Sequence, residues 1–236
     1  MINSVSVNLK INPNLCLRDP QKTNLGQKIL QHSILLIHEY GLEQFTFKKL
    51  AKRIDSTEAS IYRYFENKHI LFIYLLNWYW EWVRFRIELQ TLNVKEPIQR
   101  LKTAVRVLVD ATQRSMDTAY IDEDILHKIV VSEGTKGYHS ISVDEENREG
   151  FFLAYKALCK VIADLVLAIN PNFPYPRSLA SMLIETANNN LYFSMHLPRL
   201  TDIEGNDPDL NKKVGDLLEF IVFKLADQDG THVKDA

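Results

Sequence analysis

Apolar residues recur along most of the chain at the spacing of amphipathic helices. Stripes that return about every 3.6 residues predict helices near residues 25–40, 98–109, 151–169, 179–191 and 210–225. Gly41 stands where the cap of the first of these helices belongs, and Pro97 suits a first helical position. Glycine and proline are absent between Gly41 and Pro97, and again from there to Gly134, whereas sheet proteins need frequent turns. The pattern predicts an all-α protein of about nine helices.

One short segment near the N-terminus follows a different period. Val5, Val7, Leu9 and Ile11 alternate with other residues, which is the spacing of a strand. We therefore expect residues 1–22 to form an N-terminal extension that contains a short strand.

Composition narrows the class of protein. Of the 236 residues, 46% are hydrophobic and 25% are charged, which is the balance of a globular chain. Cys16 and Cys159 are the only cysteines, so a disulfide scaffold is excluded and a reducing cytoplasm is expected. No apolar run reaches the roughly 18 residues of a membrane span, and the N-terminus lacks the pattern of a signal peptide. We expect a cytoplasmic protein without a membrane partner.

The net charge of −2 hides an uneven distribution of charge along the chain. Residues 1–72 contain 10 Lys and Arg against 6 Asp and Glu, whereas the remainder contains 18 against 24. A basic first third on an acidic body indicates an anionic partner for the first third only.

The basic region contains the segment FTFKKLAKRIDSTEASIYRYFENKHIL, residues 45–71. Thr46 is a good N-cap for a short helix that runs to Ile54, and Thr57 is a second N-cap for a helix from Glu58 to Phe65. Asp55 falls in the turn between them, where a left-handed residue is needed. Two short helices joined by a tight turn are the layout of a helix-turn-helix, whose second helix enters the major groove.

The run from Ala51 to Leu71 also resembles the DNA-binding signature of the TetR repressor family. That signature is a small residue, a turn with Gly-Val-Ser, and then Gly-Thr-Leu-Tyr-x-Tyr/His-Phe-x-x-Lys-x-x-Leu. Asp55 departs from it by standing where glycine is usual, and Ser56 and Ala59 replace the commoner valine and glycine. The resemblance covers about residues 24–72. The matching positions are Ala51, Thr57, Ser60, Ile61, Tyr62, Tyr64, Phe65, Lys68 and Leu71.

The resemblance implies a set of DNA contacts. Hydroxyl and ammonium donors at helix starts and in the signature are expected to bind phosphate. The phosphate candidates are Thr46, Lys48, Thr57, Tyr62, Tyr64 and Lys68, and the base-reading candidates are Glu58, Ala59, Ser60 and Arg63. Two alternatives stay open. Glu58 could instead complement the dipole of its helix, and Lys48, Lys49, Lys52 and Arg53 could form an ordinary solvated face.

A helix of about His69–Leu92 follows the motif and is rich in aromatic residues. Consecutive aromatic residues at 78–80 cannot all face one core, so some are expected to line a cavity or a neighbouring element. In the family this helix links the DNA-binding domain to a ligand pocket, which implies an apolar or aromatic effector. Plain core packing is the alternative. The pocket candidates are Trp78, Trp82, Phe85, Phe152, Tyr155 and Cys159.

The resemblance implies a homodimer held by the last two long helices of each subunit. The final helix has an apolar stripe suited to such a contact. The interface candidates are Leu183, Leu191, Leu218, Ile221, Val222 and Leu225. The expected domains are therefore a helix-turn-helix domain at 23–70, a helical regulatory and dimerisation domain at 71–228 and a disordered tail at 229–236.

Enzyme signatures are missing from the sequence. It contains no GxSxG, P-loop, GxGxxG or HExxH motif. Glu123, Asp124 and His127 share a helical face, but the second carboxylate-x-x-His of a di-iron bundle is absent. We expect no cofactor, no metal and no catalytic residue. We interpret the chain as a transcriptional regulator that binds operator DNA. It is expected to act as a repressor that a small apolar or aromatic molecule releases from the operator. The alternative is a helical carrier or enzyme with an inactive helix-turn-helix.

Overall fold

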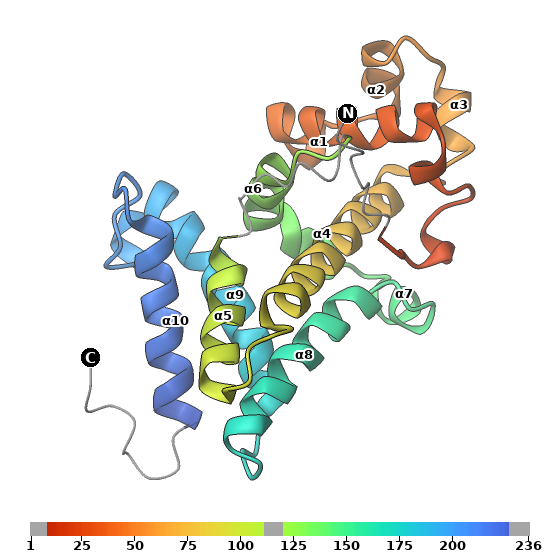
Figure 1. Ribbon diagram of the computed structural model, residues 1–236. Helices are drawn as coiled ribbons and strands as arrows, with labels where there is room; N and C mark the ends of the chain where they lie inside the picture. The colour runs from red at the N-terminus through yellow and green to blue at the C-terminus, as the bar shows by residue number, and fades with distance from the viewer. Residues whose placement is uncertain (1–8, 111–119, 227–236) are drawn as a thin grey trace, which may run out of the picture. The chain divides into compact units, whose positions relative to one another are not determined.

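The computed structural model describes residues 9–110 and 120–226, and these residues form ten α-helices and four short 3₁₀ helices without a strand (Figure 1). The predicted all-α class is confirmed. The helices are α1 (Asn24–Gln44), α2 (Phe47–Arg53), α3 (Glu58–Tyr62), α4 (Lys68–Thr91), α5 (Pro97–Val109), α6 (Glu123–Glu133), α7 (Val143–Arg148), α8 (Leu153–Ile169), α9 (Pro176–His196) and α10 (Leu210–Ala226).

The expected N-terminal strand is not found where it can be checked. Leu9 and Ile11 lie in irregular backbone, and a 3₁₀ helix, Pro13–Leu15, follows them. Val5 and Val7 lie outside the described residues, as does the expected tail at 229–236.

Local capping chemistry explains where several helices begin and end. The Thr23 hydroxyl accepts the backbone N–H of Gly26 at the start of α1. Gly41 leaves the helical conformation with φ of 76°, which interrupts α1 at the predicted cap. The carboxylate of Glu96 accepts two N–H groups at the start of α5, with Pro97 in the first position.

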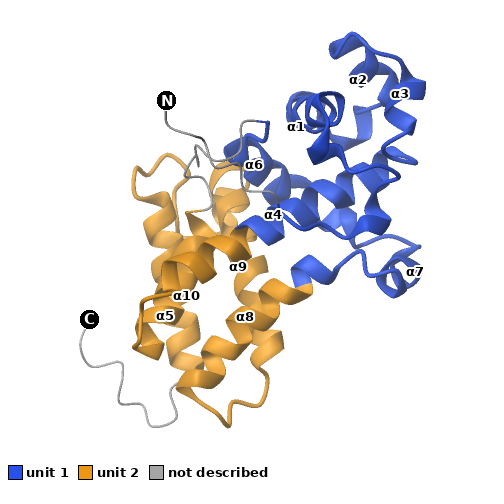
Figure 2. Ribbon diagram, turned by 45° about the vertical axis from the view of Figure 1, so that its right-hand side comes forward, with its two compact units in different colours: residues 1–82, 112–155 blue, residues 83–111, 156–236 orange. Residues whose placement is uncertain are grey.

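The described chain packs as two compact units, coloured separately in Figure 2. The first contains Met1–Trp82 and Thr112–Tyr155, and the second contains Val83–Ala111 and Lys156–Ala236. Helices α4 and α8 both begin in the first unit and end in the second.

The first unit contains the helix-turn-helix on a core of its own. α1 packs against α2 and α6, and α2 packs against α3. Apolar side chains from these helices and their connecting segments form a buried core. This core includes Ile29, Leu30, Phe45, Leu50, Ile61, Phe65 and Leu71. Packing on this core explains how two helices as short as α2 and α3 stay folded, because helices of this length are marginal alone.

In the second unit, α5 packs against α9 and α10, and α9 packs against α10 (Figure 1). Arg106 on α5 donates to Glu219, Asp216 and the carbonyl of Lys212 on or beside α10. A β-carbon at Gly215 would lie 2.4 Å from the Arg106 guanidinium, so the glycine leaves room for it. No described helix is long and apolar enough to cross a membrane.

Candidate nucleic-acid interface

Helices α2 and α3 are both capped by threonine, as their sequence predicts. The Thr46 hydroxyl accepts the N–H of Lys49, and the Thr57 hydroxyl accepts the N–H of Ser60, both at 3.2 Å. Asp55 in the turn has φ of 51°, which is the left-handed conformation that the family signature fills with glycine. The N–H of Ser56 closes the turn on the carbonyl of Ala51 at 2.9 Å. Local chemistry thus produces the helix-turn-helix, although α3 ends at Tyr62, three residues before the predicted Phe65.

The outer face of α3 carries the base-reading candidates. Glu58, Ala59 and Arg63 are exposed, and Ser60 is half-buried with its hydroxyl 2.9 Å from that of Thr57. The face combines a carboxylate, a hydroxyl, a methyl and a guanidinium. These groups can meet the donors, acceptors and thymine methyl of base edges in the major groove.

Four of the phosphate candidates occupy accessible positions on or next to α2 and α3. Thr46, Lys48 and Thr57 are exposed at the starts of α2 and α3, where backbone N–H groups also point outward. Tyr62 is 48% exposed, and its ring packs edge-on against Phe47 with the centroids 5.0 Å apart. The ring contact orients the phenol while its hydroxyl remains accessible to a phosphate oxygen.

Lys68 is half-buried at the start of α4. Its ammonium donates to the carbonyls of Leu42 at 3.1 Å and Glu43 at 3.0 Å near the end of α1. One of its three donors remains for a phosphate. The side chain therefore ties α4 to α1 in addition to any DNA contact.

The structure places Tyr64 differently from the expectation. It is only 2% exposed, and its hydroxyl hydrogen bonds that of Thr23 at 2.8 Å. A buried phenol that is already hydrogen bonded cannot reach a phosphate. Tyr64 instead links the segment after α3 to Thr23 at the start of α1. Sequence reasoning missed the role of Thr23, although a threonine directly before an apolar stripe is the signal of an N-cap.

Comparison with known families agrees with this geometry. Residues 29–75 match the sequence profile described as bacterial regulatory proteins, tetR family. These residues therefore form a helix-turn-helix domain of the tetR type, which we call the head. It includes most of α1, all of α2 and α3, and the first part of α4.

Solved structures show that the fold extends over most of the chain. A crystal structure of AibR in complex with isovaleryl coenzyme A and operator DNA is similar with a TM-score of 0.57 and 13% identity, and covers 84% of this chain and 97% of its own. The ketosteroid transcriptional regulator KstR2 of Mycobacterium tuberculosis has a TM-score of 0.54, 15% identity and coverages of 86% and 95%. The fatty acid degradation regulator FadR from Bacillus halodurans has a TM-score of 0.58 and 18% identity, and covers 84% of this chain and 96% of its own. A search of curated protein sequences found no match.

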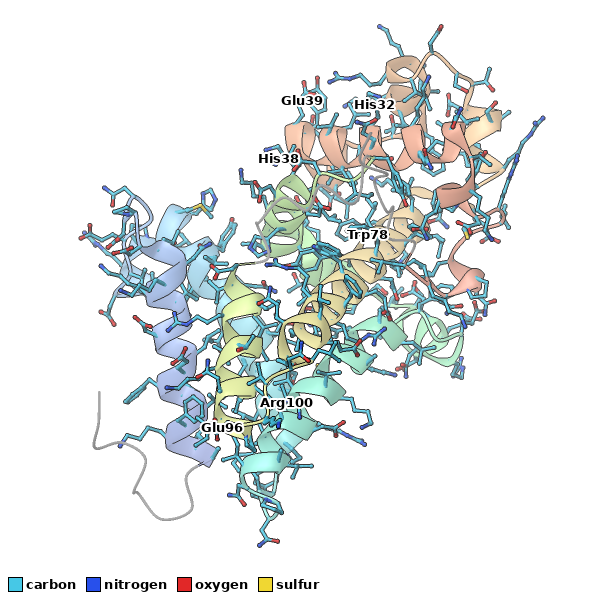
Figure 3. The ribbon with its side chains drawn as sticks, in the orientation of Figure 1. His32, His38, Glu39, Trp78, Glu96 and Arg100 are labelled. Carbon is cyan, nitrogen blue, oxygen red and sulfur yellow. The ribbon has the colours of Figure 1, made fainter. Side chains whose placement is uncertain are left out.

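Beyond the tetR-type head, the aromatic residues of α4 are mostly buried. Trp78, labelled in Figure 3, stacks on Trp82 with ring centroids 6.0 Å apart. The Trp78 indole nitrogen has no hydrogen-bond partner among the described residues. Tyr155, half-buried at the start of α8, contacts the rings of Trp80 and Tyr138. The first unit therefore contains a stacked pair of tryptophans, one with an unsatisfied indole donor, and a second set of ring contacts made by Trp80, Tyr138 and Tyr155.

The six pocket candidates do not all belong to one unit. Trp78, Trp82, Phe152 and Tyr155 belong to the first, and Phe85 and Cys159 to the second. Burial raises the pKa of the Cys159 thiol to about 11, so the thiolate needed by a nucleophile is disfavoured at neutral pH. His127 is buried and lies 2.6 Å from the Tyr79 hydroxyl. Among residues 9–110 and 120–226, no three His, Cys, Asp or Glu side chains are grouped to hold a metal.

The six dimer candidates divide according to burial within the single chain. Four of them fill the core of the second unit and two are accessible to a partner. The buried ones are Leu183, Leu191, Leu218 and Val222, the half-buried one is Ile221 and the exposed one is Leu225. Helices α9 and α10 also expose Met182, Met195 and Phe220. These side chains are the exposed apolar residues of α9 and α10.

Proposed function

We propose that this chain is a ligand-responsive transcriptional regulator that binds operator DNA as a homodimer and acts as a repressor. The observation that carries the proposal is the capped α3 helix with its exposed face of Glu58, Ala59 and Arg63, within a segment that matches the tetR family. A regulator of this kind works at the chromosome, which places it in the cytoplasm. The proposal assigns no reaction to the chain.

We assign each exposed or half-exposed side chain either to phosphate binding or to base reading. Phosphates would be bound by Thr46, Lys48, Thr57, Tyr62 and Lys68, which position the protein without reading sequence. Bases would be read by Glu58, Ala59, Ser60 and Arg63. Arg63 suits a guanine, because its guanidinium can donate two hydrogen bonds to O6 and N7.

A selection experiment tests DNA binding. The wild-type protein should enrich a two-fold symmetric duplex from a random pool, with half-sites about one helical turn apart or a multiple of it. Arg63→Ala is the matched variant, and we expect a loss of about 1–3 kcal/mol with relaxed preference at one position of each half-site. If the wild-type protein enriches no sequence, the function is not that of an operator-binding regulator.

The effector that we infer is a small apolar or aromatic molecule. Support comes from the buried Trp78, which stacks on Trp82 and has an unsatisfied indole donor, because effector sites combine apolar side chains with a few polar groups. The similar structures include a protein bound to isovaleryl coenzyme A, a ketosteroid transcriptional regulator and a fatty acid degradation regulator. Trp78, Trp82, Phe152 and Tyr155 are the proposed contacts in the first unit, and Phe85 and Cys159 remain predictions for the second.

The switch would use α4, which continues without glycine or proline from Lys68 beside the head to Thr91. An effector that binds the non-operator conformation more tightly shifts the equilibrium away from DNA. Reciprocity then requires operator DNA to weaken effector binding by the same factor. Calorimetric titration of an effector, with and without a saturating operator duplex, measures both affinities. Equal affinities would contradict the proposed coupling.

A further inference from the structure

The described N-terminal extension is a folded arm, which we define as residues 9–22. Leu15 of the arm is fully buried, and the side chain of Asn12 donates to the carbonyls of Glu149 at 3.1 Å and Gly150 at 2.9 Å. The side chain of Gln21 donates to the carbonyl of Leu9 at 2.8 Å, which closes the arm on itself. These contacts all lie within the first unit, the unit that contains the tetR-type head.

The arm runs beside the C-terminal end of the recognition helix α3. The N–H of Leu17 donates to the carbonyl of Tyr64 at 2.8 Å. Directly after the arm, the hydroxyl of Thr23, the N-cap of α1, lies within hydrogen-bond distance of the Tyr64 hydroxyl, also at 2.8 Å. Tyr64 directly follows Arg63, the C-cap of α3. Leu17 and Thr23 thus bond the carbonyl and the hydroxyl of Tyr64, which lies next to the proposed base-reading face.

Arg18 is the residue that this attachment presents to solvent. Its side chain is exposed, and its guanidinium carbon lies 5.5 Å from the centroid of the Tyr64 ring, a cation–π contact that orients the group. The neighbouring Lys22 pairs with Asp19 at 3.1 Å, whereas no described carboxylate pairs with Arg18. The arm therefore presents one oriented guanidinium beside the end of α3.

We propose that Arg18 binds a phosphate of the operator next to the end of the recognition helix. A guanidinium is suited to this role because its planar donors match two phosphate oxygens. When the N-terminal residues of α3 reach the bases, its C-terminal end lies toward the wall of the groove, where the sugar–phosphate backbone is the nearest part of the duplex. This inference rests on the proposed DNA-binding function and adds a contact outside the helix-turn-helix signature.

The experiment compares Arg18→Gln with Lys10→Gln, which removes the same charge from an exposed residue at the other end of the arm. Affinity for a duplex selected by the wild-type protein is measured by fluorescence anisotropy over a range of salt concentrations. Arg18→Gln should weaken binding roughly 3- to 10-fold, independent of base sequence, and reduce the magnitude of the salt slope by about two, because each of the two heads of the dimer loses one phosphate contact. Lys10→Gln should leave both unchanged, and Arg18→Lys should retain the slope because it keeps the charge.

Three results would overturn the assignment, and they are distinguishable. If the wild-type protein binds the duplex and Arg18→Gln binds with the same affinity and slope, the arm is structural only. If Arg18→Gln changes preference at one base pair, the residue reads a base. If the wild-type protein selects no DNA, the proposed function fails and the Arg18 contact fails with it. Melting temperatures equal to that of the wild type in both glutamine variants show that the arm remains folded in them.

Discussion

Two tyrosines that are one residue apart, Tyr62 and Tyr64, have opposite environments. Sequence alone placed both among the phosphate ligands, because both hydroxyls stand in one signature. The fold distinguishes them, since Tyr62 points to solvent while Tyr64 bonds Thr23 inside the head. A local pattern cannot resolve this difference, because the partner of Tyr64 lies 41 residues earlier in the chain.

This contrast predicts separate effects for two matched substitutions. Tyr62→Phe should weaken DNA binding roughly tenfold and leave stability unchanged, because it removes a phosphate donor but keeps the ring on Phe47. Tyr64→Phe should lower the free energy of unfolding by about 1 kcal/mol, because Thr23 loses its buried partner. Anisotropy and urea denaturation measure the two quantities. A loss of DNA affinity confined to Tyr64→Phe would reverse the assignment.

His127 gives the molecule a predictable response to acid. Burial lowers its pKa from 6.5 to about 4, and its imidazole remains neutral beside the Tyr79 hydroxyl. Between these values the unfolded chain binds a proton that the folded chain rejects, so stability decreases as the pH falls from about 6.5 to 4. The loss should amount to about 3 kcal/mol at full development.

Urea denaturation at a series of pH values tests this response. His127→Gln should show a shallower decrease than the wild type, because an amide accepts from Tyr79 without titrating. His38→Gln, at an exposed position on α1, is the control and should follow the wild type. Identical pH dependence in His127→Gln and the wild type would show that another group is responsible.

At the scale of elements, the sequence predicted best what local chemistry determines. Thr46, Thr57, Gly41 and Pro97 mark helix ends through caps and backbone conformation, and each does so in the structure. The apolar stripes of α9 and α10 were also predicted correctly. The spacing of apolar residues does not distinguish side chains buried within one chain from those buried against a second copy. Leu183 and Leu218 were therefore expected at a dimer interface, although they are core residues of the single chain. The docking of the arm depends on tertiary contacts and was not predicted.

The contact between the arm and α1 makes a prediction about Gly26. A β-carbon there would lie 2.3 Å from the carbonyl oxygen of Pro20, which is backbone and cannot easily move. Gly26→Ala should lower the free energy of unfolding by about 2 kcal/mol or more, although alanine normally favours a helix by about 1 kcal/mol.

Gly134→Ala is the matched control for this prediction. A β-carbon at Gly134 would lie 3.5 Å from a methyl of Val130, which is ordinary contact. We expect this variant to remain within about 1 kcal/mol of the wild type. If Gly26→Ala is as stable as the wild type in thermal or urea denaturation, the arm is not packed against α1 as described.

At the scale of the whole molecule, the proposed dimer depends on the exposed apolar surface of α9 and α10. Phe220 on α10 is 61% exposed, and a glutamate there would introduce a charge into an interface depleted of charge. Phe220→Glu should convert a dimer into a folded monomer in sedimentation or light-scattering measurements. Leu89→Glu makes the same change at an exposed position on α4, 59% exposed, and should remain dimeric. A monomeric wild type, or a Phe220→Glu dimer of unchanged affinity, would contradict this location of the interface.

We propose that the exposed face of the head binds duplex DNA through its cations and hydroxyls. The most direct test is the salt dependence of binding to a duplex selected by the wild-type protein. Two heads that each place Lys48, Lys68 and Arg18 on phosphates predict a slope of log affinity against log salt of about −5. Tyr62→Phe, which changes no charge, should lower affinity at every salt concentration without changing that slope. A slope near zero, or no measurable binding to any selected duplex, would contradict the assignment of this protein as a DNA-binding regulator.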